Sequence, residues 1–276
     1  MRTLGVDVSH WEGSIDWKLA APTIGFAYYK CTDGVRHVDQ QFYANRQGCQ
    51  ESGLAHAPYH LYQPSLDPLA QADFFIRTAG KAYLRYIVDV EVAERHEGIT
   101  QKLLSILQRV EQQTGIKPTI YTSTGYWNEF LQPHPQWVAE YELIVAHYTL
   151  AHIPTLPVGW NTWRIWQFND HWSFRGCNEW ADGNWFNGSH EECQSWFGNP
   201  TCPPAQTYRS DLRFRSLFDN LHMRQFPNMK SKVVGSLGRG EVVEPEELSG
   251  DDVWVRHGRG WTAIERGGYR YMEVLK

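Results

Sequence analysis

Apolar and polar positions follow two different periods along residues 1–198. Short runs rich in β-branched and aromatic residues are typical of strands. Between them, apolar residues recur every three or four positions, as in amphipathic helices. The clearest helical stripe joins Leu103, Leu107 and Val110, and Gly115 follows it as a C-cap. The pattern predicts strands at 3–9, 25–32, 54–62, 86–92, 117–123, 141–149, 162–169 and about 178–184. It predicts helices at 15–21, 39–53, 68–79, 100–115, 125–131 and 190–197.

This alternation determines the predicted fold class. Strands separated by helices imply parallel pairing through right-handed crossovers, and eight such units predict a closed barrel. With fewer than 200 residues available, we expect an irregular TIM-like (β/α) barrel of eight strands whose later helices are shortened or lost. A doubly wound open sheet is the alternative. It would carry a Gly-rich phosphate loop after the first strand, and "DVSHWEG" lacks one.

The pattern changes after residue 198. The segment 199–207 lies within "GNPTCPPAQT", which has the composition of a linker. Residues 208–276 form short alternating runs broken by Gly-rich turns, which favours a small all-β barrel. We therefore predict a first domain at 1–198, a linker at 199–207 and a second domain at 208–276.

Composition narrows the functional classes. Apolar residues make up 42% of the 276 residues, but no window of 18 apolar residues exists, so no membrane span is expected. The net charge is −5, with −7 over residues 1–204 and +2 over residues 205–276, and no basic patch favours nucleic acid. The 13 Trp and 14 Tyr residues are numerous, and aromatic faces suit the apolar C–H faces of sugar rings.

The five cysteines contain no CxxC pair, so neither a zinc site nor another cofactor is expected. Plain thiols are expected, although Cys177 and Cys193 could pair in an oxidising compartment. No basic segment followed by an apolar signal region precedes the first strand. We expect synthesis in a cytoplasm or an already mature sequence.

Two carboxylates share one predicted strand. In "YIVDVEV", Asp89 and Glu91 are two positions apart and therefore project from the same face of a strand. An exposed strand face or an ion pair would explain them without chemistry, but a parallel barrel strand has little exposed face. Like charges at this spacing raise one pKa, which a general acid working near neutral pH needs.

Two further aspartates lie near strand ends. Asp7 is near the end of the first strand and Asp182 near the end of the predicted eighth, although either could be a turn residue. Barrel closure would make those strands neighbours, and active sites of such barrels lie at the carboxyl ends of the strands. Four acids at one mouth, with many aromatics, favour glycoside hydrolysis. We expect Trp11 to pack just beyond the first strand.

Several ordered motifs resemble glycoside hydrolase family 25, the Chalaropsis-type lysozymes. They are "GVDVSHWEGSIDW", "FAYYKCTDG", "GLAHAPYHLY", "YIVDVE", "PTIYTS", "LIVAHY", "WRIWQF" and "ADGNWFNGS", over about residues 3–198. The resemblance implies an irregular (β/α) barrel. It also implies hydrolysis of the β-1,4 bond between N-acetylmuramic acid and N-acetylglucosamine in bacterial peptidoglycan. Cys31 and Asp33 stand where the family often has alanine and glutamate, and "WEG" replaces a common "WQG".

The resemblance also implies roles for individual residues. The catalytic acid falls on Glu91 and the assisting carboxylate on Asp89, while Asp7 and Asp182 complete the acidic set. The candidates for contact with the sugars are Tyr59, Tyr121, Tyr148 and Trp166.

The second domain resembles bacterial SH3-like domains, which commonly bind the cell wall, although His222 and Met223 depart from their pattern. Peptidoglycan is thus the expected partner, and the site of action is the wall outside the cytoplasmic membrane. Without a visible signal peptide, release by lysis, as for a phage endolysin, or export by another route is expected. A non-catalytic peptidoglycan-binding protein and a hydrolase of a related polymer such as chitin are the alternatives.

Overall fold

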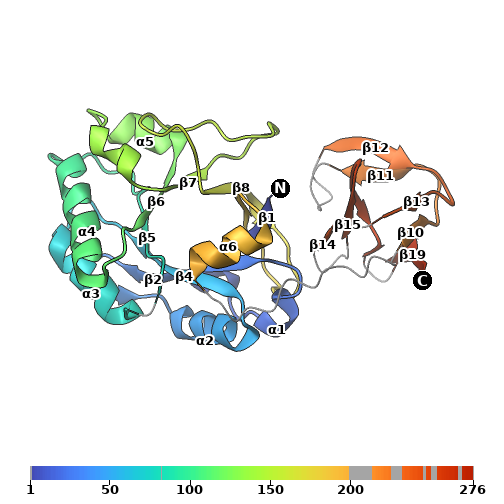
Figure 1. Ribbon diagram of the computed structural model, residues 1–276, viewed down its shortest axis with the longest axis horizontal. Coiled ribbons are helices and arrows are strands. Elements are labelled where there is room, and N and C mark those ends of the chain that lie inside the picture. The colour runs from blue at the N-terminus through green and yellow to red at the C-terminus, as the bar shows by residue number, and fades with distance from the viewer. Residues whose placement is uncertain are drawn as a thin grey trace.

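Eight strands close into a barrel in the first part of the chain (Figure 1). The computed structural model describes residues 2–81, 83–198, 213–224, 232–244, 247–249, 254–266 and 269–275. The barrel strands are β1 (Thr3–Val8), β2 (Phe26–Asp33), β4 (Ala55–Leu61), β5 (Ile87–Asp89), β6 (Thr119–Ser123), β7 (Leu143–Ala146), β8 (Ile165–Trp172) and β9 (Ala181–Phe186). A short strand β3 (His37–Val38) forms a hairpin on β2. The predicted eight-stranded barrel is confirmed.

The last barrel strand runs against the others. From β1 through β2, β4, β5, β6, β7 and β8, each pair of neighbours is parallel. Strand β9 is antiparallel to both β8 and β1. The expectation of purely parallel pairing was therefore wrong. The cause is the connection between Trp172 and Ala181, which holds no helix and is too short for a crossover, so the chain returns as a hairpin.

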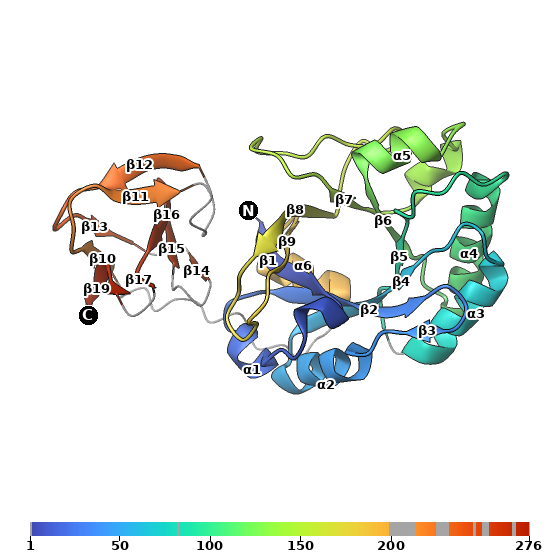
Figure 2. The same cartoon turned by 180° about the vertical axis from the view of Figure 1, so that it is seen from behind.

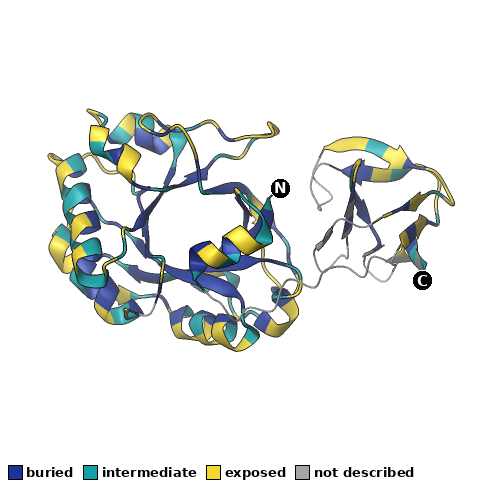
Figure 3. Ribbon diagram, in the orientation of Figure 1, coloured by how far each residue is buried: buried dark blue, intermediate teal, exposed yellow. Residues whose placement is uncertain are grey.

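Helices lie around the barrel strands, and the longer ones turn their buried faces toward the strands (Figure 3). They are η1 (His10–Glu12), α1 (Trp17–Ala20), α2 (Phe42–Ser52), α3 (Pro68–Ala79), α4 (Ile99–Thr114), α5 (Thr124–Phe130), η2 (Gln136–Glu140) and α6 (His190–Phe197). The strong stripe at 100–115 forms α4, which ends at Gly115 in the left-handed conformation, as predicted. No helix joins β7 to β8, in agreement with the expected loss of later helices. Among the described residues, no helix is long and apolar enough to cross a bilayer.

Alternate residues of each strand build two hydrophobic layers. In β2, Phe26 and Tyr28 belong to the layer inside the barrel, whereas Ala27 and Tyr29 belong to the layer beneath the helices. Helix α6 covers the amino-terminal end of the barrel: Phe197 stacks on Phe26 at 5.3 Å between ring centroids. The inner layer comprises Phe26, Tyr28, Ala55, Ala57, Ile87, Tyr121, Ile144, Ala146, Ile165 and Phe186, together with the buried face of α6. Apolar packing thus closes the amino-terminal end of the barrel, and the polar groups lie at the other end.

The four cysteines that the structure describes are buried thiols that form no disulfide with one another: Cys31, Cys49, Cys177 and Cys193. The expectation of plain thiols is confirmed for them, and Cys202 lies outside the described residues. Burial raises the pKa of the Cys49 thiol well above its ordinary value, which keeps the sulfur protonated and unreactive.

The described residues from Arg213 onward form only antiparallel strand pairs. The strands are β10 (Arg213–Ser216), β11 (Leu221–Arg224), β12 (Val233–Leu237), β13 (Val242–Val243), β14 (Glu247–Ser249), β15 (Trp254–His257), β16 (Gly260–Ala263), β17 (Glu265–Arg266), β18 (Tyr269–Arg270) and β19 (Met272–Leu275). Figure 2 shows them from the opposite side. Phe214, Leu237 and Val255 are among the buried residues of a small separate core. The SH3-like assignment and the domain boundaries stay predictions, and the linker 199–207 lies outside the described residues.

The centre of the barrel has no room for a side chain at Gly5. A Cβ added there would overlap the ring of Phe26. We expect Gly5→Ala to lower the free energy of unfolding by about 1–3 kcal/mol, because overpacking forces neighbouring groups apart. Urea denaturation measures this change. The control is Gly125→Ala in α5, where nothing lies within 4 Å of the added Cβ. Equal stability of the two variants would contradict the packing argument.

Candidate active site

The four predicted acids meet at the carboxyl ends of the parallel strands. Asp7 in β1 and Asp182 in β9 are direct cross-strand partners, and Asp89 is the last residue of β5. All four acids, including Glu91, border one pocket of about 60 Å³. The lining residues are Asp7, Tyr28, Tyr59, Ile87, Asp89, Glu91, Tyr121, Gln167 and Asp182. Asp182 is near the start of its strand, not near its end as expected. It reaches this edge because β9 runs antiparallel.

Asp89 and Glu91 face the pocket from the same side. The described strand ends at Asp89, earlier than the predicted 86–92, but the backbone N–H of Val90 donates to the carbonyl of Tyr121 at 2.9 Å. This bond keeps the chain extended. Val90 is therefore buried in the outer layer, while its two neighbours border the pocket. Asp89 is buried. Glu91 borders the same pocket, but more of its surface is exposed to solvent.

Two side-chain amides hold the carboxylate of Asp7. Its Oδ2 accepts a hydrogen bond from Gln167 Nε2 at 2.9 Å and another from Asn184 Nδ2 at 2.6 Å. Gln167 comes from β8 and Asn184 from β9, so two successive strands on the same side of β1 contribute to one carboxylate. Such hydrogen bonds stabilise the charged form and offset part of the cost of burial.

Tyrosine hydroxyls fix the orientation of those amides. Tyr121 and Tyr148 both donate to Gln167 Oε1, at 2.9 and 2.8 Å. Tyr28 donates to Asn184 Oδ1 at 2.8 Å. Because each amide oxygen is occupied by a hydroxyl, each amide nitrogen is directed at Asp7. The hydrogen bonds thus run from the tyrosine hydroxyls, through the two amides, to the carboxylate of Asp7.

Burial is the main cause of the raised pKa values of Asp7 and Asp182. It raises the pKa of Asp7 to about 7, against the opposing effect of its amide hydrogen bonds. Burial and the charge of Asp7 raise the pKa of Asp182 to about 9, and the two carboxyls share a hydrogen bond. The pair therefore keeps at least one proton at neutral pH.

The Asp89–Glu91 pair is shifted in the same direction. Burial, and then the charge of Glu91, raises the pKa of Asp89 well above its ordinary value. Burial also raises the pKa of Glu91, opposed by the charge of Lys30 and by the polar hydroxyl of Tyr121 beside it. Among the described residues, Asp89 Oδ1 is one of the buried side-chain atoms without a hydrogen-bond partner. An unpaired buried oxygen at the pocket is free to bind an incoming group.

The four aromatic candidates divide into three groups. Tyr59 and Tyr121 border the pocket. Tyr148 does not, but it is half-exposed at the rim and joins the site through its bond to Gln167. Trp166 is not brought to the pocket. It is buried in the outer layer, where its Nε1 donates to the carbonyl of His147 at 2.8 Å. The alternation of β8 explains this correction, because Gln167 faces inward and its neighbour must face outward.

Three contributors were missed from the sequence: Tyr28, Gln167 and Asn184. Strand alternation contained a signal for Asn184, which is two positions after Asp182 and so shares its face. Tyr28 is the cross-strand partner of Asp7. Finding these contributors required the register of the strands, not only their positions in the chain.

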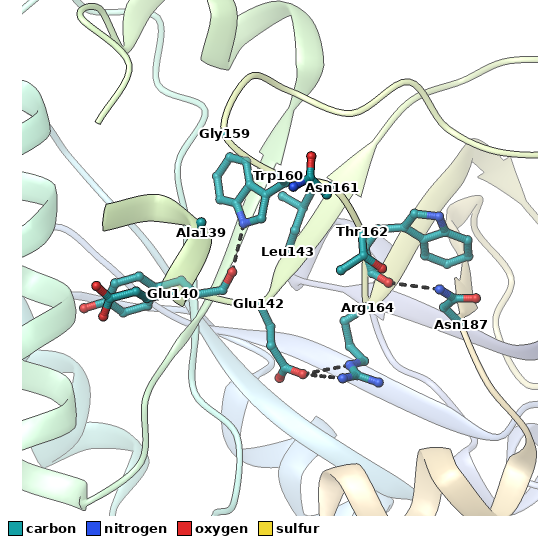
Figure 4. A pocket seen from close by; sticks show the side chains of 12 residues that line it. Ala139, Glu140, Glu142, Leu143, Gly159, Trp160, Asn161, Thr162, Arg164 and Asn187 are labelled. Atoms are coloured by element: carbon teal, nitrogen blue, oxygen red, sulfur yellow. Dashed lines mark hydrogen bonds and ion pairs between the residues drawn. The ribbon is translucent and has the colours of Figure 1, made fainter. Parts of the chain in front are cut away.

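A second hollow of about 290 Å³ lies at the opposite edge of the barrel, before β7 and β8 (Figure 4). Its charged groups have partners: Arg164 Nη2 lies 2.6 Å from Glu142 Oε1, and Glu140 Oε2 lies 3.4 Å from Lys117 Nζ. Glu142 Oε2 also accepts a hydrogen bond from Trp196 Nε1 at 2.7 Å. With its carboxylate satisfied on both oxygens, this hollow lacks the unpaired acids that acid–base chemistry requires.

The barrel and its acidic mouth define the class of protein. Glycoside hydrolases use carboxyl groups with raised pKa values, and in barrel enzymes these groups lie at the carboxyl ends of the strands. A sequence model described as Glycosyl hydrolases family 25 matches residues 6–177. The chain belongs to this family.

Individual relatives agree with this assignment. The chain is 32% identical over 210 residues to the uncharacterized protein YegX from Escherichia coli strain K12, covering 70% of this chain and 72% of that protein. It is 31% identical over 202 residues to Lysozyme M1 from Streptomyces globisporus, covering 67% and 68%. Among solved structures, the bacterial lysozyme from Streptomyces coelicolor matches with a TM-score of 0.66 at 27% identity. That match covers 71% of this chain and 97% of the other.

The raised pKa of Asp182 predicts a pH-dependent cost in stability. In the unfolded chain this carboxyl titrates near its ordinary pKa of 3.8, whereas in the folded protein its pKa is about 9. As pH rises between these values, the unfolded chain loses a proton that the folded protein keeps, so stability falls. Asp182→Asn cannot ionise. We expect its melting temperature to exceed that of the wild type by roughly 5 °C at pH 8.5 and by much less at pH 4.5.

Thermal unfolding followed by circular dichroism at the two pH values measures this difference. The control is Glu97→Gln, which removes an exposed carboxylate between β5 and α4. We expect it to change the melting temperature equally at both values. An equal rise in melting temperature for Asp182→Asn at pH 4.5 and 8.5 would disprove the link between the pKa of Asp182 and stability.

Proposed function

We propose that this protein is a lysozyme that hydrolyses the β-1,4 bond between N-acetylmuramic acid and N-acetylglucosamine in bacterial peptidoglycan. The observation that carries the proposal is the cluster of four carboxyls with raised pKa values at the mouth of a family 25 barrel. The similarity to Lysozyme M1 supports the same substrate. The polymer lies outside the cytoplasmic membrane, so the enzyme acts on the cell wall.

Glu91 is the general acid in this proposal. Its pKa is raised by burial of the carboxyl group, so it keeps a proton at a pH where a free glutamate has lost it. It is also more exposed than Asp89, and so more accessible to an incoming glycosidic oxygen. Glu91 donates its proton to this oxygen as the bond breaks. It then takes a proton from the water that attacks the anomeric carbon, which restores the acid.

Asp89 assists from the floor of the pocket. Its buried Oδ1 has no protein partner, which leaves it available to the substrate. It would either support the positive charge that develops at the anomeric carbon or orient the N-acetyl group of the sugar for attack. Both roles use an oxygen that the protein itself leaves unsatisfied. The substrate would thus complete a hydrogen-bond set that is incomplete in the free enzyme.

Asp7 and Asp182 position and tune the site. Asp7 is held by two amides whose own orientation depends on Tyr121, Tyr148 and Tyr28. Because the hydroxyl of Tyr121 also lies beside Glu91, the Asp7 network is connected to the proposed acid through one side chain. Tyr59 and Tyr121 present their rings to the sugar at the pocket, and Tyr148 lies at its rim.

We further propose that residues 208–276 form an SH3-like domain that binds the wall. The antiparallel strands and separate core of the described residues support a small all-β unit. The Streptomyces coelicolor lysozyme, 97% of whose chain matches the barrel region, supports the barrel as the catalytic unit. Binding by a second unit would keep the enzyme on an insoluble polymer between cleavage events.

Removal of the proposed acid tests the mechanism. We expect Glu91→Gln to lower the rate of peptidoglycan cleavage by about 10²- to 10⁴-fold, because glutamine cannot donate the proton. Purified peptidoglycan is the substrate, new reducing ends report the rate, and product masses identify the cleaved bond. The control is Glu97→Gln, which replaces an exposed glutamate close in sequence. Clearance at the wild-type rate by Glu91→Gln would refute the assignment, and products from chitin alone would refute the substrate.

Removal of residues 205–276 tests the second part. We expect the truncated protein to sediment with insoluble walls about tenfold less than the full chain, since one of two linked binding units is lost. It should still cleave soluble glycan fragments, because the four acids lie in the barrel. A truncated protein that keeps full affinity for walls would show that this region does not bind them.

A further inference from the structure

Two tryptophans are exposed at the same edge of the barrel as the acids. Trp11 is 76% exposed and Trp180 is 53% exposed, although tryptophan is highly buried on average. The expectation that Trp11 packs beyond the first strand was therefore wrong. Trp11 follows Asp7 by four residues and Trp180 precedes Asp182 by two, and these aspartates are cross-strand partners. Both tryptophans therefore follow or precede an acid of the pocket by only a few residues, at the barrel edge where β1 ends and β9 begins.

The segments that carry the two rings touch each other. Trp11 is in η1, and Trp180 ends the connection between β8 and β9. The thiol of Cys177 in that connection donates to the carbonyl of Glu12 at 3.8 Å and to the carbonyl of Glu179 at 3.4 Å. The residues next to each tryptophan are therefore linked through one sulfur. We call these two exposed residues the aromatic shelf (Trp11 and Trp180).

Each ring of the shelf lies against a histidine that is held by an aspartate. His10 lies 4.5 Å from Trp11 between ring centroids, and its Nδ1 is 2.8 Å from Asp39 Oδ2. Asp39 is itself buried and also accepts a hydrogen bond from the backbone N–H of His10.

The second unit repeats this arrangement in the β8–β9 hairpin. His171 lies 6.2 Å from Trp180 between ring centroids, and its Nδ1 is 2.8 Å from Asp170 Oδ1. Two Asp–His–Trp units thus place a tryptophan against a histidine while much of the indole surface stays open to solvent. Fixed rings with open apolar surface are suited to binding, because little conformational freedom is lost when a ligand covers them.

We propose that the aromatic shelf binds sugar rings of the glycan strand beyond those at the cleaved bond. This proposal rests on the proposed lysozyme function. The acidic pocket of about 60 Å³ is far smaller than the roughly 300–1,000 Å³ that ligand sites commonly provide. A polymer must therefore continue over the rim. The C–H faces of sugars are apolar and pack well on indole rings, and the shelf is the exposed aromatic surface that adjoins Asp7 and Asp182 along the chain.

The test measures binding without turnover. In the full-length Glu91→Gln protein, titration calorimetry gives the affinity for soluble, uncrosslinked peptidoglycan glycan strands of eight or more sugars. We expect Trp11→Ala and Trp180→Ala each to weaken this affinity roughly two- to tenfold, the range typical of one aromatic contact. Trp11→Phe and Trp180→Tyr should retain most of this affinity. The control is Tyr43→Ala, which removes a similarly exposed ring (61%) from the outer helix α2 and should change nothing.

A disaccharide of the same polymer is the second ligand. We expect its affinity to be equal in the Glu91→Gln parent and in both tryptophan variants, because it does not extend onto the shelf. Unchanged long-strand binding in both alanine variants would overturn the shelf while leaving the lysozyme function intact. An equal loss for the disaccharide would also overturn it. A parent that binds no glycan at all would instead overturn the proposed function, and the shelf with it.

Discussion

The pairing of β1 with an antiparallel β9 is the constraint on which the acidic site depends. It places Asp7 directly opposite Asp182, two carboxyls that repel each other when ionised and lose hydration when buried. The fold meets this cost with hydrogen bonds. Asn184 follows on the same face of β9, Gln167 arrives from β8, and both donate to Asp7. The proton that this pair keeps at neutral pH relieves the remaining repulsion. The closure of the barrel and the assembly of the site are thus a single structural event.

The four acids differ because their surroundings differ. Asp7 has two amide donors, Asp182 shares its hydrogen bond with Asp7, and Asp89 has a buried oxygen with no partner. Glu91 has the most open position and the polar hydroxyl of Tyr121 beside it. Because their surroundings differ, the same chemical group has a structural role at some of these positions and a reactive role at others. The unsatisfied oxygen is a cost to the free protein that a bound sugar could remove.

Much of the fold followed from hydrophobic periodicity, because long elements such as α4 bury a clear stripe. The four acids could be found because a carboxylate in an apolar run is conspicuous. The direction of β9 could not be found in this way, since it depends on the absence of a helix between Trp172 and Ala181. Gln167 and Trp166 show a second limit: both faces of a barrel strand are buried, so the sequence alone does not tell which of two neighbours faces the site. Amides also carry no charge, so nothing marked Gln167 before the register was known, and Asn184 was marked only by its spacing from Asp182.

The register of β1 with β9 also has a consequence for how the protein is made. Thr3 pairs with Phe186, so the first barrel strand to be synthesised waits for the last barrel strand before both its edges are bonded. Contacts of such long sequence separation form late. Until then, β1 is paired only with β2, and a nascent chain has Asp7 without Asp182 or Asn184. The order of synthesis therefore delays completion of the acidic site until nearly the whole barrel has been translated.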